Sequence, residues 1–157
     1  MDKKTLTIDY TEYGSIDELE PKYKELMQAA IDALKGSYAP YSHFNVGAAV
    51  RLRNGIVVKG ANQENAAFPS GLCAERVAMF SAAARYPEES FDALALVAAQ
   101  NGDLQPAPSY PCGACRQVMA QYETKFGKPI KVLVGSKQKI QVFENVSGLL
   151  PFVFTDI

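Results

Sequence analysis

The sequence has few cysteines and histidines, no excess of positive charge and no long apolar run. Each of these absences limits the classes of function that the protein could have. Only three cysteines and one histidine occur in 157 residues. The formal net charge is -1, so no basic excess is available to follow a phosphate backbone, and we expect no nucleic-acid partner. No apolar run approaches the roughly 20 residues that a helix needs to cross a bilayer, so we expect no membrane partner.

The odd number of cysteines disfavours a framework of disulfides. Three reduced thiols suit the cytoplasm, which is the expected location. A length of 157 residues with 48% apolar content suits one soluble domain with a sizeable core. We expect residues 1–157 to form that domain, with 1–21 as an N-terminal arm. A β-leaning stretch at 6–10 makes the arm either a flexible extension or an extra edge strand.

Helices are predicted to alternate with short buried strands along the rest of the chain. Ser15 and Glu18 match a capping box, which predicts a helix from Ser15 to about Gly36. Asn54-Gly55 between two apolar runs predicts a β-hairpin with a type I′ turn. Further helices are predicted over 73–85 and 112–126, and further strands over 93–99, 130–134 and 139–143. This alternation predicts a three-layer α/β fold.

All three cysteines fall in two short motifs at predicted helix starts. Cys73 opens Cys-Ala-Glu-Arg, whereas Cys112 and Cys115 belong to Pro-Cys-Gly-Ala-Cys. Helix N-termini favour thiolates, and residues three apart share one helical face. Three thiolates leave one position of a tetrahedral zinc ion open, as in catalytic sites and unlike structural ones. Glu75 is then placed to move protons at the open position, and Arg76 to offset the thiolate charge.

The residues alone also allow simpler interpretations. Cys112 and Cys115 could form a redox pair, with Cys73 as a buried apolar residue. A structural zinc site would need a fourth ligand, and His43 is the candidate because it is the sole histidine, although its polar loop favours an ordinary surface position. Glu75 could simply be a surface charge in the first turn of its helix, where it complements the helix dipole.

Several segments in order resemble cytidine deaminases of the small, homotetrameric class, over nearly the whole chain from about residue 22. The cysteine motifs are the cysteine variant of the H-x-E…P-C-x-x-C pattern of zinc nucleobase deaminases. The resemblance implies a three-layer α-β-α fold with a mixed, roughly five-stranded sheet. The segments that carry it are YSHFNVGAA at 41–49, NQENA at 62–66, CAER at 73–76, PCGACRQ at 111–117 and LLP at 149–151 followed by Phe154.

The resemblance also implies roles for the candidate residues. The three cysteines hold Zn²⁺, and Glu75 moves protons between water, the pyrimidine N3 and the departing ammonia. Without the resemblance, the two phenylalanines below would be assigned to core packing and the asparagine to a turn. The implied substrate contacts are Asn62 and Glu64 on the ribose hydroxyls, Phe44 beside the base, a backbone contact from Ala74 near the ring, and Phe154 in a neighbouring subunit's site.

The expected activity is zinc-dependent hydrolytic deamination of cytidine and 2′-deoxycytidine to uridine and 2′-deoxyuridine plus ammonia, a reaction of pyrimidine salvage. The resemblance implies a homotetramer. The chain departs from the common pattern in its longer N-terminal arm, in Gln63 and in Phe68. The alternatives are a deaminase of blasticidin-like nucleosides or of a base in nucleic acid, and a zinc-stabilised binding module without catalysis. The Asn62/Glu64 segment favours a free nucleoside.

Overall fold

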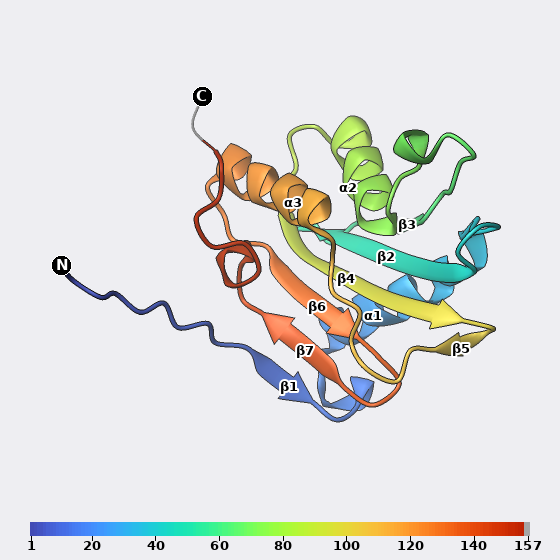
Figure 1. The fold of residues 1–157 in the computed structure, drawn as a ribbon, viewed down its shortest axis with the longest axis horizontal. Helices are drawn as coiled ribbons and strands as arrows, with labels where there is room; N and C mark the ends of the chain where they lie inside the picture. The colour runs from blue at the N-terminus through green and yellow to red at the C-terminus, as the bar shows by residue number, and fades with distance from the viewer. Residues whose placement is uncertain (156–157) are drawn as a thin grey trace.

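A mixed β-sheet forms the middle layer of the protein (Figure 1). The structure is a computed structural model, which describes residues 1–155. Strands β4 and β6 are parallel, and the other pairings are antiparallel. The strands in sheet order are β1 (Thr11–Tyr13), β7 (Ile140–Phe143), β6 (Lys131–Gly135), β4 (Phe91–Gln100), β2 (Phe44–Leu52) and β3 (Val57–Ala61), with β5 (Asp103–Leu104) paired to β4.

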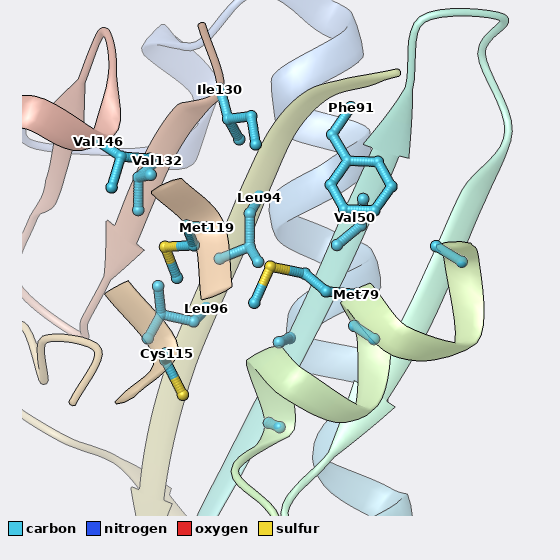
Figure 2. Packing of buried hydrophobic residues seen from close by; sticks show 14 of the residues in the cluster. Val50, Met79, Phe91, Leu94, Leu96, Cys115, Met119, Ile130, Val132 and Val146 are labelled. Carbon is cyan, nitrogen blue, oxygen red and sulfur yellow. The ribbon is translucent and has the colours of Figure 1, made fainter. Parts of the chain in front are cut away.

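Helices cover both faces of this sheet, which confirms the predicted α-β-α layering. Helix α1 (Pro21–Ala33) packs on one face, where Leu26 and Met27 are buried against Val97 and Leu133. Helices α2 (Ala74–Arg85) and α3 (Gly113–Phe126) cover the other face (Figures 1 and 2). Within residues 1–155, no helix combines the length and apolar character required to cross a membrane.

The sheet has seven strands in the described part of the chain, two more than the predicted five. The two short strands, β1 and β5, account for the difference, because three and two residues give too short a pattern to recognise. Part of the N-terminal arm is thus an edge strand that pairs with β7. It lies at Thr11–Tyr13, whereas the β-leaning stretch pointed to 6–10.

The first helix begins later than the capping pattern predicted. The Ser15 hydroxyl accepts a hydrogen bond from the Asp17 amide at 3.1 Å, but it caps only a 3₁₀ turn, Ile16–Glu18. Helix α1 begins at Pro21. Proline disfavours the helical conformation in the residue before it, and it suits the first helical position because it lacks an N–H. The chain is therefore extended at Glu20 (φ -54°, ψ 144°), and this separates the two helical segments.

The predicted hairpin between β2 and β3 is present, but its turn is not type I′. Gly55 has a positive φ of 95°, whereas Asn54 is not among the described residues with positive φ. Type I′ requires positive φ at both central positions, so that part of the prediction was wrong. The Asn54 side chain instead accepts a hydrogen bond from the Ile56 amide at 3.0 Å, which stabilises the longer loop.

Gly60 lets helix α2 approach strand β3 closely, and this approach positions the start of the helix. A Cβ atom at residue 60 would lie 2.4 Å from the Ala78 amide nitrogen and 2.6 Å from the Ala74 carbonyl oxygen. We therefore expect Gly60→Ala to lower the free energy of unfolding by about 1–3 kcal/mol, since backbone atoms must move. Gly36→Ala is the control, because its Cβ would meet only Ala61 at an ordinary 3.7 Å. Equal midpoints in urea denaturation of the two variants would contradict this.

Candidate active site and metal centre

The three cysteines meet where α2 and α3 begin. Cys73 is the N-cap of α2 and Cys112 the N-cap of α3, and Cys115 lies in the first turn of α3. The Sγ atoms of Cys73 and Cys112 are 3.7 Å apart, and those of Cys112 and Cys115 are 3.5 Å apart. Zinc–sulfur bonds of about 2.3 Å in tetrahedral geometry require sulfur atoms about 3.8 Å apart. All three ligand atoms lie within 4.8 Å of one another, so the cluster could hold one zinc ion.

The surroundings of the metal-free cluster favour a thiolate at Cys73. A hydrogen bond from the Cys115 thiol, together with one from Arg76, lowers the pKa of Cys73 to about 5 despite partial burial. The pKa of Cys115 is raised by the neighbouring Cys73 and by burial, so in the metal-free protein the Cys115 proton stays beside the Cys73 thiolate. Bound metal would replace that proton, because cysteine ligands bind as thiolates.

Arg76 is the positive group that faces the cluster. Its Nη2 donates to Cys73 Sγ at 3.5 Å. Its Nε is buried and has no hydrogen-bond partner among the described residues. A centre with three thiolates carries a formal charge near -1 when zinc is bound, and the guanidinium next to it offsets that charge. Arg76 therefore lies beside the thiolates, and its role in charge compensation stays a prediction.

Glu75 is a buried carboxyl group beside the cluster. Its side chain is only 3% exposed, in the first turn of α2. Burial raises its pKa from an ordinary 4.5 to about 7, and the nearby charge of Cys73 acts in the same direction. A surface charge at a helix start would not be buried in this way, so the simpler interpretation of Glu75 is wrong. A pKa near neutrality suits a group that accepts and donates protons at physiological pH.

The cluster lies at a pocket of about 820 Å³. That volume is within the range of small-molecule sites, roughly 300–1,000 Å³. Cys73, Cys112, Glu75 and Arg76 contribute to its lining, and Cys115 does not. The remaining lining residues are Tyr41, Ser42, Phe44, Val46, Asn62, Gln63, Glu64, Asn65, Phe68, Gly71, Leu72, Leu96, Ser109 and Tyr110. The structure thus brings three of the predicted substrate-binding residues, Phe44, Asn62 and Glu64, to one cavity with the metal centre.

Asn62 and Glu64 are already held by hydrogen bonds from their own chain. Asn62 Oδ1 accepts from the Val46 amide at 2.8 Å and from a serine hydroxyl, and its Nδ2 donates to the Phe44 carbonyl at 2.9 Å. One N–H of the amide is left for a ligand. Glu64 accepts from the amides of Tyr41 and Ser42 at 2.8 and 3.2 Å and from the Ser42 hydroxyl. Its pKa is lowered, chiefly by that hydroxyl, so it presents an ionised acceptor.

Three other candidates do not line the pocket. Ala74 is fully buried at the start of α2. Phe154 is 68% exposed, and its carbonyl accepts a hydrogen bond from Gln117 at 2.6 Å. His43 occupies the left-handed region (φ 55°) before β2 and does not belong to the metal-ligand group found within residues 1–155. The structural-zinc alternative therefore has no support from His43.

Several residues of the pocket wall had no role predicted from the sequence. Tyr110 and Ser109 come directly before the Pro111-Cys112 motif, so closeness to the motif was the only signal for them. Leu96 comes from the middle of β4 and reaches the pocket only because the sheet passes under both helices. No spacing in the sequence indicates that contact.

The chain matches known deaminases in sequence. Residues 20–127 match the family model described as the cytidine and deoxycytidylate deaminase zinc-binding region. These residues include all three cysteines, which confirms zinc as the predicted cofactor. A cytidine deaminase of Halalkalibacterium halodurans is 43% identical over 130 residues, covering 83% of this chain and 92% of the relative. A probable cytidine deaminase of Dictyostelium discoideum is 34% identical over 136 residues, covering 84% and 86%.

Solved structures agree with these matches. The crystal structure of cytidine deaminase from Burkholderia pseudomallei superposes with a TM-score of 0.70 at 41% identity, covering 83% of this chain and 97% of the other. Cytidine deaminase from Mycobacterium tuberculosis gives a TM-score of 0.67 at 30% identity, covering 87% and 100%. The sequence match, the shared fold and the three-thiol centre together show that the chain belongs to the family of zinc-dependent cytidine and deoxycytidylate deaminases.

Proposed function

We propose that this protein hydrolyses cytidine and 2′-deoxycytidine to uridine and 2′-deoxyuridine, with release of ammonia, and that it serves pyrimidine salvage in the cytoplasm. The observation that carries the proposal is the buried carboxyl group of Glu75 beside a three-thiol centre in a nucleoside-sized pocket. The names of the related proteins support cytidine as the substrate. We also propose that residues 1–157 form a single catalytic domain.

The reaction adds water at C4 of the pyrimidine and expels the amino group. Zinc, when bound by Cys73, Cys112 and Cys115, supplies a Lewis acid that makes water nucleophilic near neutral pH. Glu75 takes one proton from the attacking water and places it on N3 of the ring. It then takes the proton of the hydroxyl group now on C4 and delivers it to the leaving amino group, which departs as ammonia and leaves the C4 carbonyl of the uridine product. Its raised pKa, near 7, lets one carboxyl group carry out both transfers.

The pocket residues bind the nucleoside in this proposal. Phe44 packs beside the base. Ala74 is not in the pocket lining but lies between the lining residues Cys73 and Glu75, and in this proposal its backbone contacts the ligand near the ring. The ionised carboxylate of Glu64 accepts hydrogen bonds from ribose hydroxyls, and the remaining N–H of Asn62 donates to one. Both side chains are preorganised by contacts within the chain, so little rotamer entropy is lost when the sugar binds.

The direct test is an ultraviolet absorbance assay of the purified protein with cytidine, with ammonia measured in parallel. Loss of cytidine absorbance together with an equal yield of ammonia is expected. The assay is repeated with 2′-deoxycytidine and with a cytosine in single-stranded DNA, and only the nucleosides are expected to react. Bound zinc without any ammonia release would instead indicate a zinc-stabilised binding module.

Asn62→Ala and Glu64→Ala are expected to weaken processing of the nucleoside while leaving the poor substrate cytosine little changed. Loss of one hydrogen bond to a charged group costs about 1.5–3 kcal/mol, so kcat/KM for cytidine should fall roughly 10- to 150-fold for Glu64→Ala. Steady-state kinetics with cytidine and with free cytosine provide the comparison. Equal losses for both substrates would show that the two residues are structural.

We propose a homotetramer with active sites completed across subunit interfaces. Phe154 is exposed and lies outside the pocket of its own chain, as expected for a residue that contacts a neighbour. Sedimentation of the active enzyme as a tetramer is expected, and Phe154→Ala should keep the tetramer and raise KM. An active monomer would rule out this assembly. A dissociated Phe154→Ala variant would show that Phe154 acts chiefly in the interface.

A further inference from the structure

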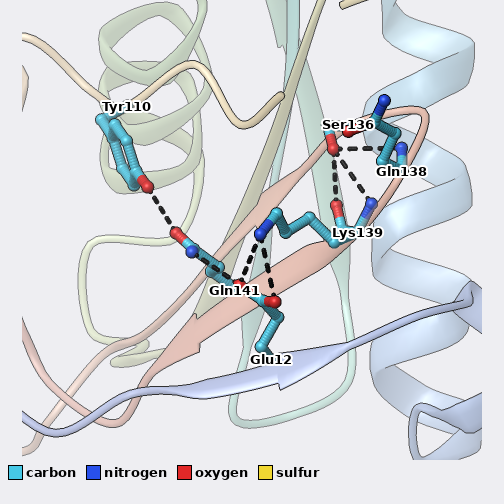
Figure 3. Close-up of polar contacts among 6 residues, drawn as sticks. All are labelled: Glu12, Tyr110, Ser136, Gln138, Lys139 and Gln141. Atoms are coloured by element: carbon cyan, nitrogen blue, oxygen red, sulfur yellow. Dashed lines mark hydrogen bonds and ion pairs between the residues drawn. The ribbon is translucent and has the colours of Figure 1, made fainter. Parts of the chain in front are cut away.

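A chain of hydrogen bonds joins the N-terminal strand to the wall of the active-site pocket (Figure 3). The Tyr110 hydroxyl donates to Gln141 Oε1 at 2.5 Å. Gln141 Nε2 donates to Glu12 Oε2 at 2.9 Å. Glu12 also accepts hydrogen bonds from Lys139 Nζ at 3.0 and 3.1 Å. Three segments far apart in the sequence are therefore connected through side chains.

The ionisation of Glu12 determines which group donates in each of these hydrogen bonds. The Glu12 carboxylate is ionised, because hydrogen bonds from Gln141 and Lys139 lower its pKa. An ionised carboxylate only accepts, so Gln141 must turn its amide nitrogen toward Glu12. The amide oxygen then faces Tyr110, whose hydroxyl must donate. Removal of Glu12 would leave Gln141 free to turn over and present its nitrogen to the tyrosine.

The backbone register supports the contact between the two strands. Glu12 and Gln141 are direct partners in the antiparallel pairing of β1 with β7, so their side chains share one face of the sheet. Gln141 is only 6% exposed. A buried amide that loses a partner costs free energy, so the hydrogen bonds at both of its ends are strongly favoured.

Tyr110 is the end of this series of hydrogen bonds that lies at the active-site pocket. It lines the pocket, and it precedes Cys112 by two residues in the loop that leads into α3. The ring is about half exposed and has no other side-chain hydrogen bond among the described residues, so Gln141 is its anchor. Strand β1, at the other end, precedes residue 20, where the match to the family model begins.

We propose that Glu12, acting through Gln141, holds Tyr110 in the wall of the nucleoside pocket, so that the N-terminal strand is a positioning element for substrate binding. The proposal rests on the proposed deaminase function. Glu12 does not touch the reacting atoms, so its loss should act on KM and leave the chemical step nearly unchanged. An N-terminal strand that merely stabilises the sheet would change the melting temperature without that kinetic signature.

Kinetics of the full-length, zinc-loaded protein provide the first test. Glu12→Ala and Tyr110→Phe are each expected to raise KM for cytidine about 2- to 10-fold with kcat within about 2-fold, the effect of one hydrogen bond of ordinary strength. The double variant should show no more than the larger single effect, because both changes break one chain of contacts. Glu12→Gln keeps an acceptor for Gln141 and should restore part of the loss. Thr11→Ala, on the opposite face of the same strand, is the control.

A second readout does not depend on turnover. The chain contains no tryptophan, so Tyr110→Trp introduces a single fluorophore into the pocket wall, and its indole N–H can still donate to Gln141. Adding Glu12→Ala to this variant should increase acrylamide quenching about 2-fold or more if Tyr110 loses its anchor. Adding Thr11→Ala should not change it.

The outcomes separate the inference from the proposed function. No turnover of cytidine by the unmodified protein would overturn the function, while the quenching comparison would still decide whether Glu12 anchors position 110. Unchanged KM and unchanged quenching in the Glu12→Ala variants would overturn the inference. Equal effects of Thr11→Ala and Glu12→Ala would also overturn the inference, because they would mean that β1 only stabilises the sheet.

Discussion

Glu75→Gln is expected to leave a folded, zinc-loaded protein whose turnover of cytidine falls by about 10²–10⁴-fold, the usual contribution of a general acid–base group. The amide has nearly the same shape as the carboxyl group but cannot exchange a proton. In the proposed reaction Glu75 serves both the N3 transfer and the departure of ammonia, so the substitution removes both proton transfers together. Rates are measured by absorbance, and zinc by metal analysis of the same samples.

Stability measurements distinguish this loss from misfolding. The pKa of Glu75 is raised from 4.5 to about 7 in the folded protein, so ionisation costs stability as pH rises through that window. In the metal-free protein, Glu75→Gln should therefore be more stable than the unmodified chain above pH 7 and no more stable below about pH 4.5. Glu25→Gln, the same change at an exposed position of α1, should alter neither rate nor stability. Near-normal turnover in Glu75→Gln would remove Glu75 from the mechanism.

Cys115→Ala is expected to abolish tight zinc binding and, with it, activity. The unmodified protein should contain one zinc ion per chain, and the variant less than about 0.1 after dialysis, because two thiolates cannot form the centre. The melting temperature should also fall, since a ligand that binds only the folded state stabilises it. Inductively coupled plasma analysis and the cytidine assay together check the prediction.

Met119→Leu is the matched control for this variant. Met119 and Cys115 are both fully buried on α3, one helical turn apart, in the same core cluster (Figure 2). A volume-conserving change at Met119 should keep zinc and activity. In the unmodified protein, chelation should remove activity and added zinc should restore it. A zinc-free protein with a disulfide between Cys112 and Cys115 would contradict the metal-centre assignment.

The metal centre could be predicted from the sequence because its parts are local. Cys73 and Cys112 precede helical runs, and the N-cap position fixes where a side chain lies relative to the first turn. The three-residue spacing of Cys112 and Cys115 puts both sulfurs on one side of α3. The open fourth position follows from a count of ligands. All of these properties belong to one or two helical turns, within which sequence determines geometry.

The ends and edges of the fold were predicted less well because they depend on partners. Strand β1 exists only because β7 offers it a free edge, and no pattern in three residues reveals that. At the first helix, the capping pattern at Ser15 and the proline at position 21 compete, and the proline determines where α1 begins. The Asn54-Gly55 dipeptide predicted a hairpin correctly, but the loop length selected a different turn.

The sequence by itself determined the family, the candidate zinc ligands and a carboxyl group next to one of them, because these depend on residue identity and on motifs of a few residues. Only the tertiary structure brought the sulfur atoms of Cys73 and Cys112, 39 residues apart, to within 3.7 Å of each other. Only the tertiary structure decided that Glu75 is buried and has a raised pKa, since desolvation comes from the packing of α2 against the sheet. The structure alone also placed Tyr110, Gln141 and Glu12 in one hydrogen-bonded chain. The separation of 129 residues between Glu12 and Gln141 is bridged by strand pairing, and that of 31 residues between Tyr110 and Gln141 by a side-chain hydrogen bond. No local pattern encodes either long-range contact.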